Sequence, residues 1–450
     1  MPESARALLR SLTSTFTELS GADVADPDIE HSDVDGPIGW SGYDAARRRA
    51  AERTGEDESV LCGVGTVPGP GGATDAMLIA FEFGFLGGSI GERTGLRIER
   101  AFARARELRL PVVSLIATGG SRMQEGMRAL TQLQRIARAS AATRDAGLPR
   151  IAVLCDPATG GGWATLGAGA DVTLAVAGAQ VGFAGARVRP DGGPDDAAAY
   201  TAEGQLRTGH VDQVVDPADL PRALGRWLRL VTTPAGPVDP PRPLGATTPP
   251  RSGWDAVQAA RAETRPRAES YVDAEFAWRE DIGGDRCGGV DPGVLCGFGH
   301  RDGVTTAYAA QCGTPTTPAG FRTAARLVRL ASRLDIPVLT LVDTPGAAND
   351  ADAERAGVGP AIAELFDAIA SASVPVTTLV IGEGGSGGAL AFAASERMWI
   401  TADAYFSVTS PEAAAQILKR DAGDVPATAD QLRLRPQDVV DLGIARGIVR

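Results

Sequence analysis

Four glycine-rich segments in this chain each follow a short apolar run. They are residues 118–120, 159–162, 344–346 and 382–389. Glycine accepts backbone conformations that other residues avoid, and it lets the main chain approach a ligand closely. A helix that begins directly after such a turn presents free N–H groups and a partial positive charge. The pattern therefore predicts backbone sites for an oxyanion or a phosphate.

The densest of these turns, residues 384–388, matches the G-x-S-x-G pattern of serine hydrolases letter by letter. A serine nucleophile would need a histidine base. The chain has only His31, His210 and His300, and none of them lies in a glycine turn after a predicted strand. No G-K-[ST] ending of a nucleotide-binding loop follows any of the turns. The turns offer many backbone hydrogen-bond donors and almost no acid–base side chains. This combination suits a reaction in which the protein stabilises an oxyanion while the substrate or cofactor handles the proton or CO₂.

The elements that must position these turns repeat one local plan. A run rich in Val, Ile and Leu is followed by a glycine turn and then by a helical pattern, as in residues 123–142. In that segment apolar residues recur at helical spacing, at Met127, Leu130, Leu133, Ile136 and Ala137. Strand, turn, helix and strand in this order predict parallel strands with right-handed crossovers. The predicted fold class is therefore α/β, with helices covering a β core.

A proline-rich stretch divides the chain into two halves. Residues 234–252 contain seven prolines, at positions 234, 237, 240, 241, 243, 249 and 250, which predicts an extended linker between domains 1–233 and 253–450. The two halves also resemble each other. The offset that aligns Pro111 with Pro337 is the same offset that aligns Pro149 with Pro375. We therefore expect one fold that has been duplicated.

Composition excludes several classes of function. The net charge of −12 argues against nucleic acid and against an anionic membrane surface as partners. No signal peptide and no apolar run long enough to span a membrane are present, so we expect a cytoplasmic protein. The five cysteines form no C-x-x-C pair, which predicts buried free thiols and no zinc site.

At this point the motifs resemble a known family. The first half is similar to the β subunit, and the second half to the α subunit, of the carboxyltransferase component of bacterial acetyl-CoA carboxylase. The segments that carry the resemblance are FGFLGGSIGERTG (83–95), GGSRMQEGM (119–127), DPATGGG (156–162), VGFAGARV (181–188), GFRTAARLVRLASRLDIPVLTLVDTPGA (320–347), VIGEGGSGGALA (380–391) and SVTSPEAAAQIL (407–418).

The resemblance implies two tandem crotonase-like domains and an acyl-CoA carboxyltransferase. Such an enzyme moves a carboxyl group from carboxybiotin, held on a separate carrier protein, to acetyl-CoA, and so forms malonyl-CoA for fatty acid synthesis. It implies a biotin carboxyl carrier protein and a biotin carboxylase as partners, and a homo-oligomer. By position, the N–H groups of Gly119 and Gly120 would hold the thioester oxygen, and those of Gly387, Gly388 and Ala389 would hold the biotin side. Further substrate-binding positions carried over are Gly87, Gly88, Arg122, Gly161, Gly162, Phe183, Gly185, Gly346, Gly384 and Gly385.

Several departures from the family pattern keep two alternatives open. The four-cysteine zinc ribbon of the β subunit is missing, and the segment 311–320 lacks the basic loop of the α subunit. Trp163 stands where a smaller residue is common, and could reshape the acyl pocket. A biotin-independent decarboxylase of a malonyl thioester would use the same glycines. An inactive scaffold subunit would have no need of them.

Overall fold

The computed structural model describes residues 3–19, 34–189, 194–233, 236 and 238–450. His31 and the linker prolines Pro234 and Pro237 lie outside these ranges. The chain divides into two compact units, Met1–Thr232 and Thr233–Arg450, and each is described by itself. No helix in the described ranges is long and apolar enough to cross a membrane.

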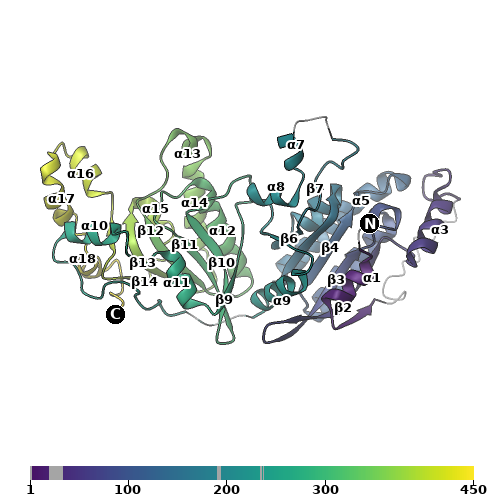
Figure 1. Cartoon of the computed structure of the whole chain (residues 1–450), viewed down its shortest axis with the longest axis horizontal. Coiled ribbons are helices and arrows are strands. Elements are labelled where there is room, and N and C mark those ends of the chain that lie inside the picture. Colours follow the sequence, from purple (N-terminus) through teal and green to yellow (C-terminus); the bar gives the residue numbers. More distant parts are fainter. Residues whose placement is uncertain (1–2, 20–33, 190–193, 234–235, 237) are drawn as a thin grey trace. The chain divides into compact units, whose positions relative to one another are not determined.

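The first unit is built on one mixed sheet (Figure 1). Its central strands pair in parallel, and every residue of the strand 112–118 is buried. A strand that is buried on both faces has a nearly continuous apolar sequence. This segment has such a sequence, and it therefore forms a central strand. The sheet order is β1 (Thr15–Glu18), β2 (Val60–Gly69), β3 (Gly72–Phe81), β4 (Val112–Thr118), β5 (Arg150–Thr159), β6 (Val172–Val176) and β8 (Gln213–Val215), with β7 (Val181–Gly182) paired to β5.

Helices cover both faces of this sheet. Helices α4 (Glu92–Leu108) and α5 (Met127–Asp145) pack together on one face, whose core includes Ile98, Phe102 and Ile136. On the other face lie α1 (Ala5–Leu12) and α9 (Leu220–Val231). The other helices in the described part of this unit are α3 (Tyr43–Thr54), η2 (Leu86–Gly88), η3 (Met123–Glu125), α6 (Gly160–Gly162), η4 (Trp163–Gly167), α7 (Pro194–Ala198) and α8 (Ala202–Arg207).

The helix predicted for residues 123–142 begins later than expected. Gly126, with φ of +55°, separates η3 from α5, so the long helix starts at Met127. Its buried stripe runs through residues 129, 132, 136, 139 and 143, while Met127 and Leu130 are exposed. Of the five apolar residues predicted for the stripe, Ile136 is buried and Leu133 is half-buried, while Ala137 is exposed as well. The predicted stripe was therefore wrong at both ends, because mainly alanine and polar side chains face the core there.

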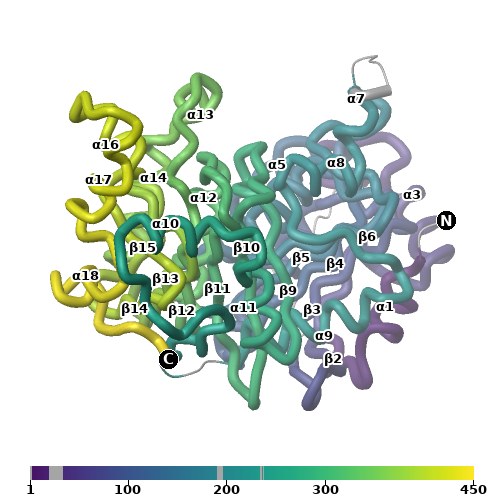
Figure 2. Tube along the Cα trace, turned by 60° about the vertical axis from the view of Figure 1, so that its left-hand side comes forward, coloured from purple at the N-terminus to yellow at the C-terminus, as the bar shows by residue number. Residues whose placement is uncertain are grey.

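The second unit repeats the same plan. Its sheet order is β14 (Met398–Ile400), β13 (Val376–Gly385), β12 (Val338–Thr344), β11 (Val304–Gln311), β10 (Val294–Arg301) and β9 (Trp278–Asp281), with β15 (Tyr405–Ser407) paired to β13. Helices α12 (Pro318–Arg333) and α14 (Val358–Ala370) pack on one face, and α10 (Gly253–Arg261) and α11 (Ala268–Glu275) on the other. Figure 2 shows the C-terminal helices beside α10. The remaining helices are α13 (Ala351–Arg355), α15 (Ser386–Leu390), α16 (Pro411–Ile417), η5 (Ala422–Asp424), α17 (Val425–Gln431) and α18 (Pro436–Asp441).

The duplication predicted from the sequence is confirmed by the strands. The offset that aligns Pro111 with Pro337 also places β4 on β12 and β5 on β13, with the same lengths and the same parallel pairing. Helices α4 and α12 begin at equivalent positions under that alignment. Each unit therefore carries an equivalent pair of strand ends.

The described part of the proline-rich stretch is extended and is bound to the second unit. Residues 238–252 contain no helix or strand. The carbonyl of Val238 accepts a hydrogen bond from Thr377 Oγ1 (2.8 Å), and the N–H of Leu244 donates to the hydroxyl of Tyr271 (3.1 Å). These bonds tie the segment to strand β13 and to helix α11 of the second unit.

All five cysteines are free thiols, as expected. Their burial is mixed, because Cys62 and Cys296 are buried while Cys287 is exposed. Burial raises the pKa of the Cys62 thiol to about 12, so it stays neutral.

Candidate functional site

Two glycine turns of the first unit meet at one edge of its sheet. Strands β4 and β5 are parallel neighbours, and Thr118 pairs with Ala158 near their carboxyl ends. The turn after β4 and helix α6 after β5 therefore lie against each other. A Cβ atom added to Gly160 would lie 3.0 Å from the Cα of Gly120, and both residues have positive φ, +65° and +106°. Only glycine fits this close approach of two backbones.

The N–H groups of Gly119 and Gly120 are engaged within the chain. Gly119 donates to the carbonyl of Gly87 (2.9 Å), and Gly120 donates to Thr118 Oγ1 (3.1 Å). The Thr118 hydroxyl in turn donates to the carbonyl of Gly88 (2.6 Å). This differs from the prediction that both N–H groups hold a substrate oxygen. The Gly119 N–H instead ties the turn directly to the segment 86–88, and the Gly120 N–H does so through the Thr118 hydroxyl. No sequence motif reveals such local pairing.

The first turn of α6 supplies other donors. The Gly160 N–H is bonded to the carbonyl of Phe183 (3.1 Å), which anchors the turn, and the ring of Phe183 is exposed. Gly161 and Gly162 follow within the first helical turn, where N–H groups have no partner inside the helix. Both are buried; a Cβ on Gly120 would lie 3.8 Å from the nitrogen of Gly161, and one on Gly162 would collide with the side chain of Thr118. The start of the helix carries a partial positive charge.

The other predicted positions of the first unit surround this edge. Gly87 and Gly88 form η2, and a Cβ on Gly88 would collide with the carbonyl oxygen of Ala117. A Cβ on Gly185 would lie 3.9 Å from Thr159 Oγ1. Trp163 begins the π-helical segment η4, which is a form found often at functional sites. Its ring belongs to the hydrophobic core.

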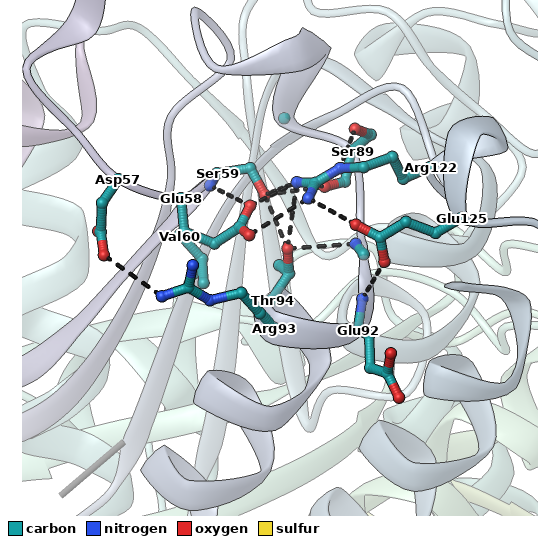
Figure 3. A network of polar contacts seen from close by, with 12 residues as sticks. Asp57, Glu58, Ser59, Val60, Ser89, Glu92, Arg93, Thr94, Arg122 and Glu125 are labelled. Carbon is teal, nitrogen blue, oxygen red and sulfur yellow. Dashed lines mark hydrogen bonds and ion pairs between the residues drawn. The ribbon is translucent and has the colours of Figure 1, made fainter. Parts of the chain in front are cut away.

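Arg122, predicted to bind substrate, is enclosed by protein (Figure 3). Its side chain is 0% exposed and forms ion pairs with Glu58 and with Glu125 (3.0 Å). It also donates to Ser59 Oγ (3.1 Å) and to the carbonyl of Ser89 (2.9 Å). The prediction of a direct substrate contact is therefore corrected: a guanidinium whose donors are used within the core has none to offer a ligand.

The buried ion pair between Glu58 and Arg122 stays charged at neutral pH. Burial alone would raise the pKa of the Glu58 carboxyl, but the charge and hydrogen bonds of Arg122 outweigh burial and lower that pKa to about 2. Burial also raises the pKa of Tyr43, whose hydroxyl donates to Glu125. The cluster is thus a fixed buried ion pair with a neutral tyrosine beside it.

The second unit has the equivalent pair of turns. Thr344 pairs with Gly384 at the ends of β12 and β13. The Gly346 N–H donates to Thr344 Oγ1 (3.1 Å), and Gly346 has φ of +144°, as its counterpart Gly120 has a positive φ. A Cβ on Gly385 would collide with the carbonyl of Pro345, and one on Gly388 would collide with the backbone nitrogen of Ala347. The predicted residues Gly346, Gly384, Gly385 and Gly388 are therefore in one place.

Helix α15 presents the donors of this second edge. Gly387 and Gly388 lie in its first turn, and Gly387 is exposed with open space where a Cβ would stand. Ala389 is buried at the fourth helical position, where an N–H normally bonds to the carbonyl of the N-cap residue. Gln311 Nε2 donates to the carbonyl of Gly388 (3.1 Å) and holds the turn from within the core.

A buried ion pair behind these turns was missed by the sequence reasoning. Asp343, 0% exposed, accepts from Arg265 Nη2 (2.7 Å), from Arg267 Nη1 (3.2 Å) and from the Glu383 N–H (3.1 Å). The sequence did contain a signal for it, because Asp343 is the single charged residue in the buried strand 338–344. Charged residues are rarely buried unless they are paired.

Two family models match the chain. One, described as a carboxyl transferase domain, matches residues 39–193, and the other, described as acetyl co-enzyme A carboxylase carboxyltransferase-like, matches residues 250–450. A protein of Salinispora arenicola named acetyl-coenzyme A carboxylase carboxyl transferase subunits beta/alpha is 39% identical over 92% of this chain and 77% of its own length. A protein of the same name from Saccharopolyspora erythraea is 37% identical over 96% of this chain and 78% of its own length.

Solved structures share the fold. A transcarboxylase 12S structure with methylmalonyl-coenzyme A and methylmalonic acid bound aligns with a TM-score of 0.78 and 19% identity, over 100% of this chain and 87% of that one. A single-chain, multi-domain long-chain acyl-CoA carboxylase aligns with a TM-score of 0.74 and 19% identity, over 99% and 44%. The expected crotonase-like fold is confirmed in this way.

Two crotonase-like units with glycine turns at equivalent strand ends define an acyl-CoA carboxyltransferase. The chain belongs to the family of the fused beta/alpha carboxyl transferase subunits of acetyl-coenzyme A carboxylase.

Proposed function

We propose that this protein transfers a carboxyl group from carboxybiotin, borne by a separate carrier protein, to acetyl-CoA. The observation that carries the proposal is the repetition of one arrangement in both units. Each unit joins a positive-φ glycine, Gly120 or Gly346, to the first turn of a short helix at a neighbouring strand end. A reaction that develops negative charge on two different oxygens needs two such sites.

In the first unit the N–H groups of Gly161 and Gly162 would face the thioester oxygen of the acyl-CoA. Negative charge grows on that oxygen as the α-carbon loses its proton and the enolate forms. Removing one donor of this kind typically costs about 3–4 kcal/mol of barrier. Gly119 and Gly120 shape the opposite wall through their bonds to Gly87 and Thr118.

In the second unit the N–H groups of Gly387 and Gly388 would face the ureido oxygen of biotin. Carboxybiotin supplies the activated carboxyl group and a nitrogen able to accept the substrate proton. The glycine turns then need only to bind, orient and stabilise charge. This division of labour agrees with the scarcity of acid–base side chains at both edges.

The partners follow from the same chemistry. Neither an ATP-binding loop nor a biotin-acceptor lysine motif occurs in the sequence. A biotin carboxylase and a biotin carboxyl carrier protein would therefore act with this chain, which we expect to assemble as a homo-oligomer in the cytoplasm.

Mass spectrometry of malonyl-CoA turnover tests the proposal. Purified protein is incubated with malonyl-CoA alone and with malonyl-CoA plus biocytin. Loss of malonyl-CoA that requires biocytin supports carboxyl transfer in the reverse direction. Formation of acetyl-CoA without biocytin would instead identify a decarboxylase, and inertness to both would contradict the choice of substrate. Propionyl-CoA in competition with acetyl-CoA in the forward reaction tests the acyl chain.

A further inference from the structure

We propose that Arg122 is a positioning residue, which fixes the turn at residues 119–121 and through it the thioester side of the reaction. The inference rests on the proposed function. Arg122 follows this turn directly, and its own N–H donates to the carbonyl of Ile90 (2.9 Å). The Ile90 N–H donates to the carbonyl of Gly120 (2.8 Å). The backbone at Arg122 and the turn are thus parts of one pairing.

The guanidinium joins segments that are distant in the sequence. It reaches Glu58 and Ser59 before strand β2, Ser89 in the loop after η2, and Glu125 in η3 (Figure 3). Loop 86–90 receives the N–H of Gly119 on one side and Arg122 on the other. A shift of Arg122 would therefore move both the loop 86–90 and the turn at residues 119–121.

The cluster extends to two helices through Glu125. One Glu125 oxygen accepts the N–H of Glu92 (2.5 Å) at the start of α4, and the other accepts the hydroxyl of Tyr43, the first residue of α3. A carboxylate at the N-terminus of a 17-residue helix is favoured by the helix dipole. The charges that face the guanidinium from its surroundings are Glu58 and Glu125, and Arg47 acts on Glu58 from further away.

A buried ion pair of this kind specifies geometry more than it adds stability. Removing two charges from water costs nearly as much as their attraction returns, so such pairs are weak evidence for stability. Their fixed hydrogen-bond directions do select one arrangement of the segments that they join. Small displacements at a reacting centre lower the rate by up to about a hundredfold. An ion pair that holds the turn in place therefore affects catalysis without touching the substrate.

The chain offers a matched control in Arg150. Its guanidinium pairs with Asp171 (2.7 Å), and the two side chains are 10% and 7% exposed. Arg150 starts strand β5, so it lies at the opposite end of that strand from α6. Loss of the Arg150 pair should disturb the stability of the same unit without moving the glycine turns.

The experiment compares Arg122→Lys and Arg122→Met with Arg150→Lys and Arg150→Met. For each variant we would measure the melting temperature, kcat, the KM for malonyl-CoA with biocytin, the KM for biocytin, and the Kd for acetyl-CoA. We expect the Arg122 variants to lower kcat about tenfold or more and to change the acyl-CoA constants, with the KM for biocytin unchanged. The Arg150 variants should lower only the melting temperature.

Tyr43→Phe is a milder second variant in case the Arg122 variants do not fold, because it removes one hydroxyl from the cluster. A smaller fall in kcat, in the same direction, is expected for it. Equal effects of the Arg122 and Arg150 variants on all constants would overturn the inference. Failure of the proposed function is seen separately, as absence of turnover by the wild type. In that case the Kd for acetyl-CoA tests the positioning role by itself. An unchanged Kd in the Arg122 variants would overturn that role.

Discussion

Gly160 and Ser386 occupy equivalent places in the two units, and both have a left-handed backbone, with φ of +65° and +59°. Each is the first residue of the short helix that follows the equivalent ten-residue strand of its unit, β5 or β13. Glycine adopts this conformation without strain, whereas a serine there is strained. The second unit therefore keeps a strained, exposed hydroxyl where the first unit has only backbone.

Ser386→Gly is expected to stabilise the second unit. Relief of the left-handed strain exceeds the entropy cost of glycine, and we expect a gain of about 0.5–1 kcal/mol in the free energy of unfolding. Urea unfolding measures it. Asp335→Gly is the control, since Asp335 also has a positive φ, +58°, at the end of α12. Stabilisation by Asp335→Gly but not by Ser386→Gly would show that the serine hydroxyl contributes a compensating bond.

Gly387→Ala and Gly388→Ala should separate binding from folding. A Cβ on Gly387 meets no atom within 4 Å, so this variant should fold with an unchanged melting temperature. Its methyl group would stand where we place the biotin ureido group, and the KM for biocytin should rise by roughly tenfold. A Cβ on Gly388 would collide with the backbone of Ala347, so that variant should be destabilised. An unaltered KM in Gly387→Ala would argue against the proposed biotin site.

Acid should weaken the first unit through Glu58. The pKa of this carboxyl is about 2 in the folded chain and near its ordinary 4.5 when unfolded. A lowered pKa stabilises the fold at pH values above 4.5, and this contribution is lost as the pH falls from about 4.5 toward 2. Hydrogen exchange of peptides from the first unit, followed across this window, should show the loss of protection.

Glu58→Gln is the matched variant for that measurement. It should cost about 3–5 kcal/mol at neutral pH, because Arg122 loses its main partner in the core. The part of the pH dependence that belongs to Glu58 should vanish with it. Identical pH profiles for wild type and variant would contradict the low pKa of Glu58.

The sequence was sufficient for the architecture because the architecture follows from periodic signals. Apolar runs, glycine turns and the common offset between the two halves predicted two α/β units with equivalent strand ends. Hydrogen-bond direction has no such signal. Gly119 and Gly120 look like ideal donors in the sequence, yet local pairing with Gly87 and Thr118 uses their N–H groups. Arg122 was predicted to bind substrate, and its place in the core could not be foreseen because its main partner, Glu58, lies far away along the chain.

Asp343→Asn should impair the second unit selectively. Asp343 holds Arg265 and Arg267, and it also binds the N–H of Glu383, one residue before Gly384. Loss of its charge leaves the enclosed guanidinium of Arg265 without a counterion, at a cost of about 3–5 kcal/mol. The end of β13 should then loosen, and because helix α15 begins at that end, the KM for biocytin should rise while the Kd for acetyl-CoA stays the same.

Arg122→Lys should give the opposite pattern. Steady-state kinetics with both substrates, run on the two variants side by side, measure the difference. If both variants altered the constants for both substrates alike, the assignment of one oxyanion site to each unit would fail. The ion pairs of Arg122 and Asp343 support different sites, so their loss must affect different substrates.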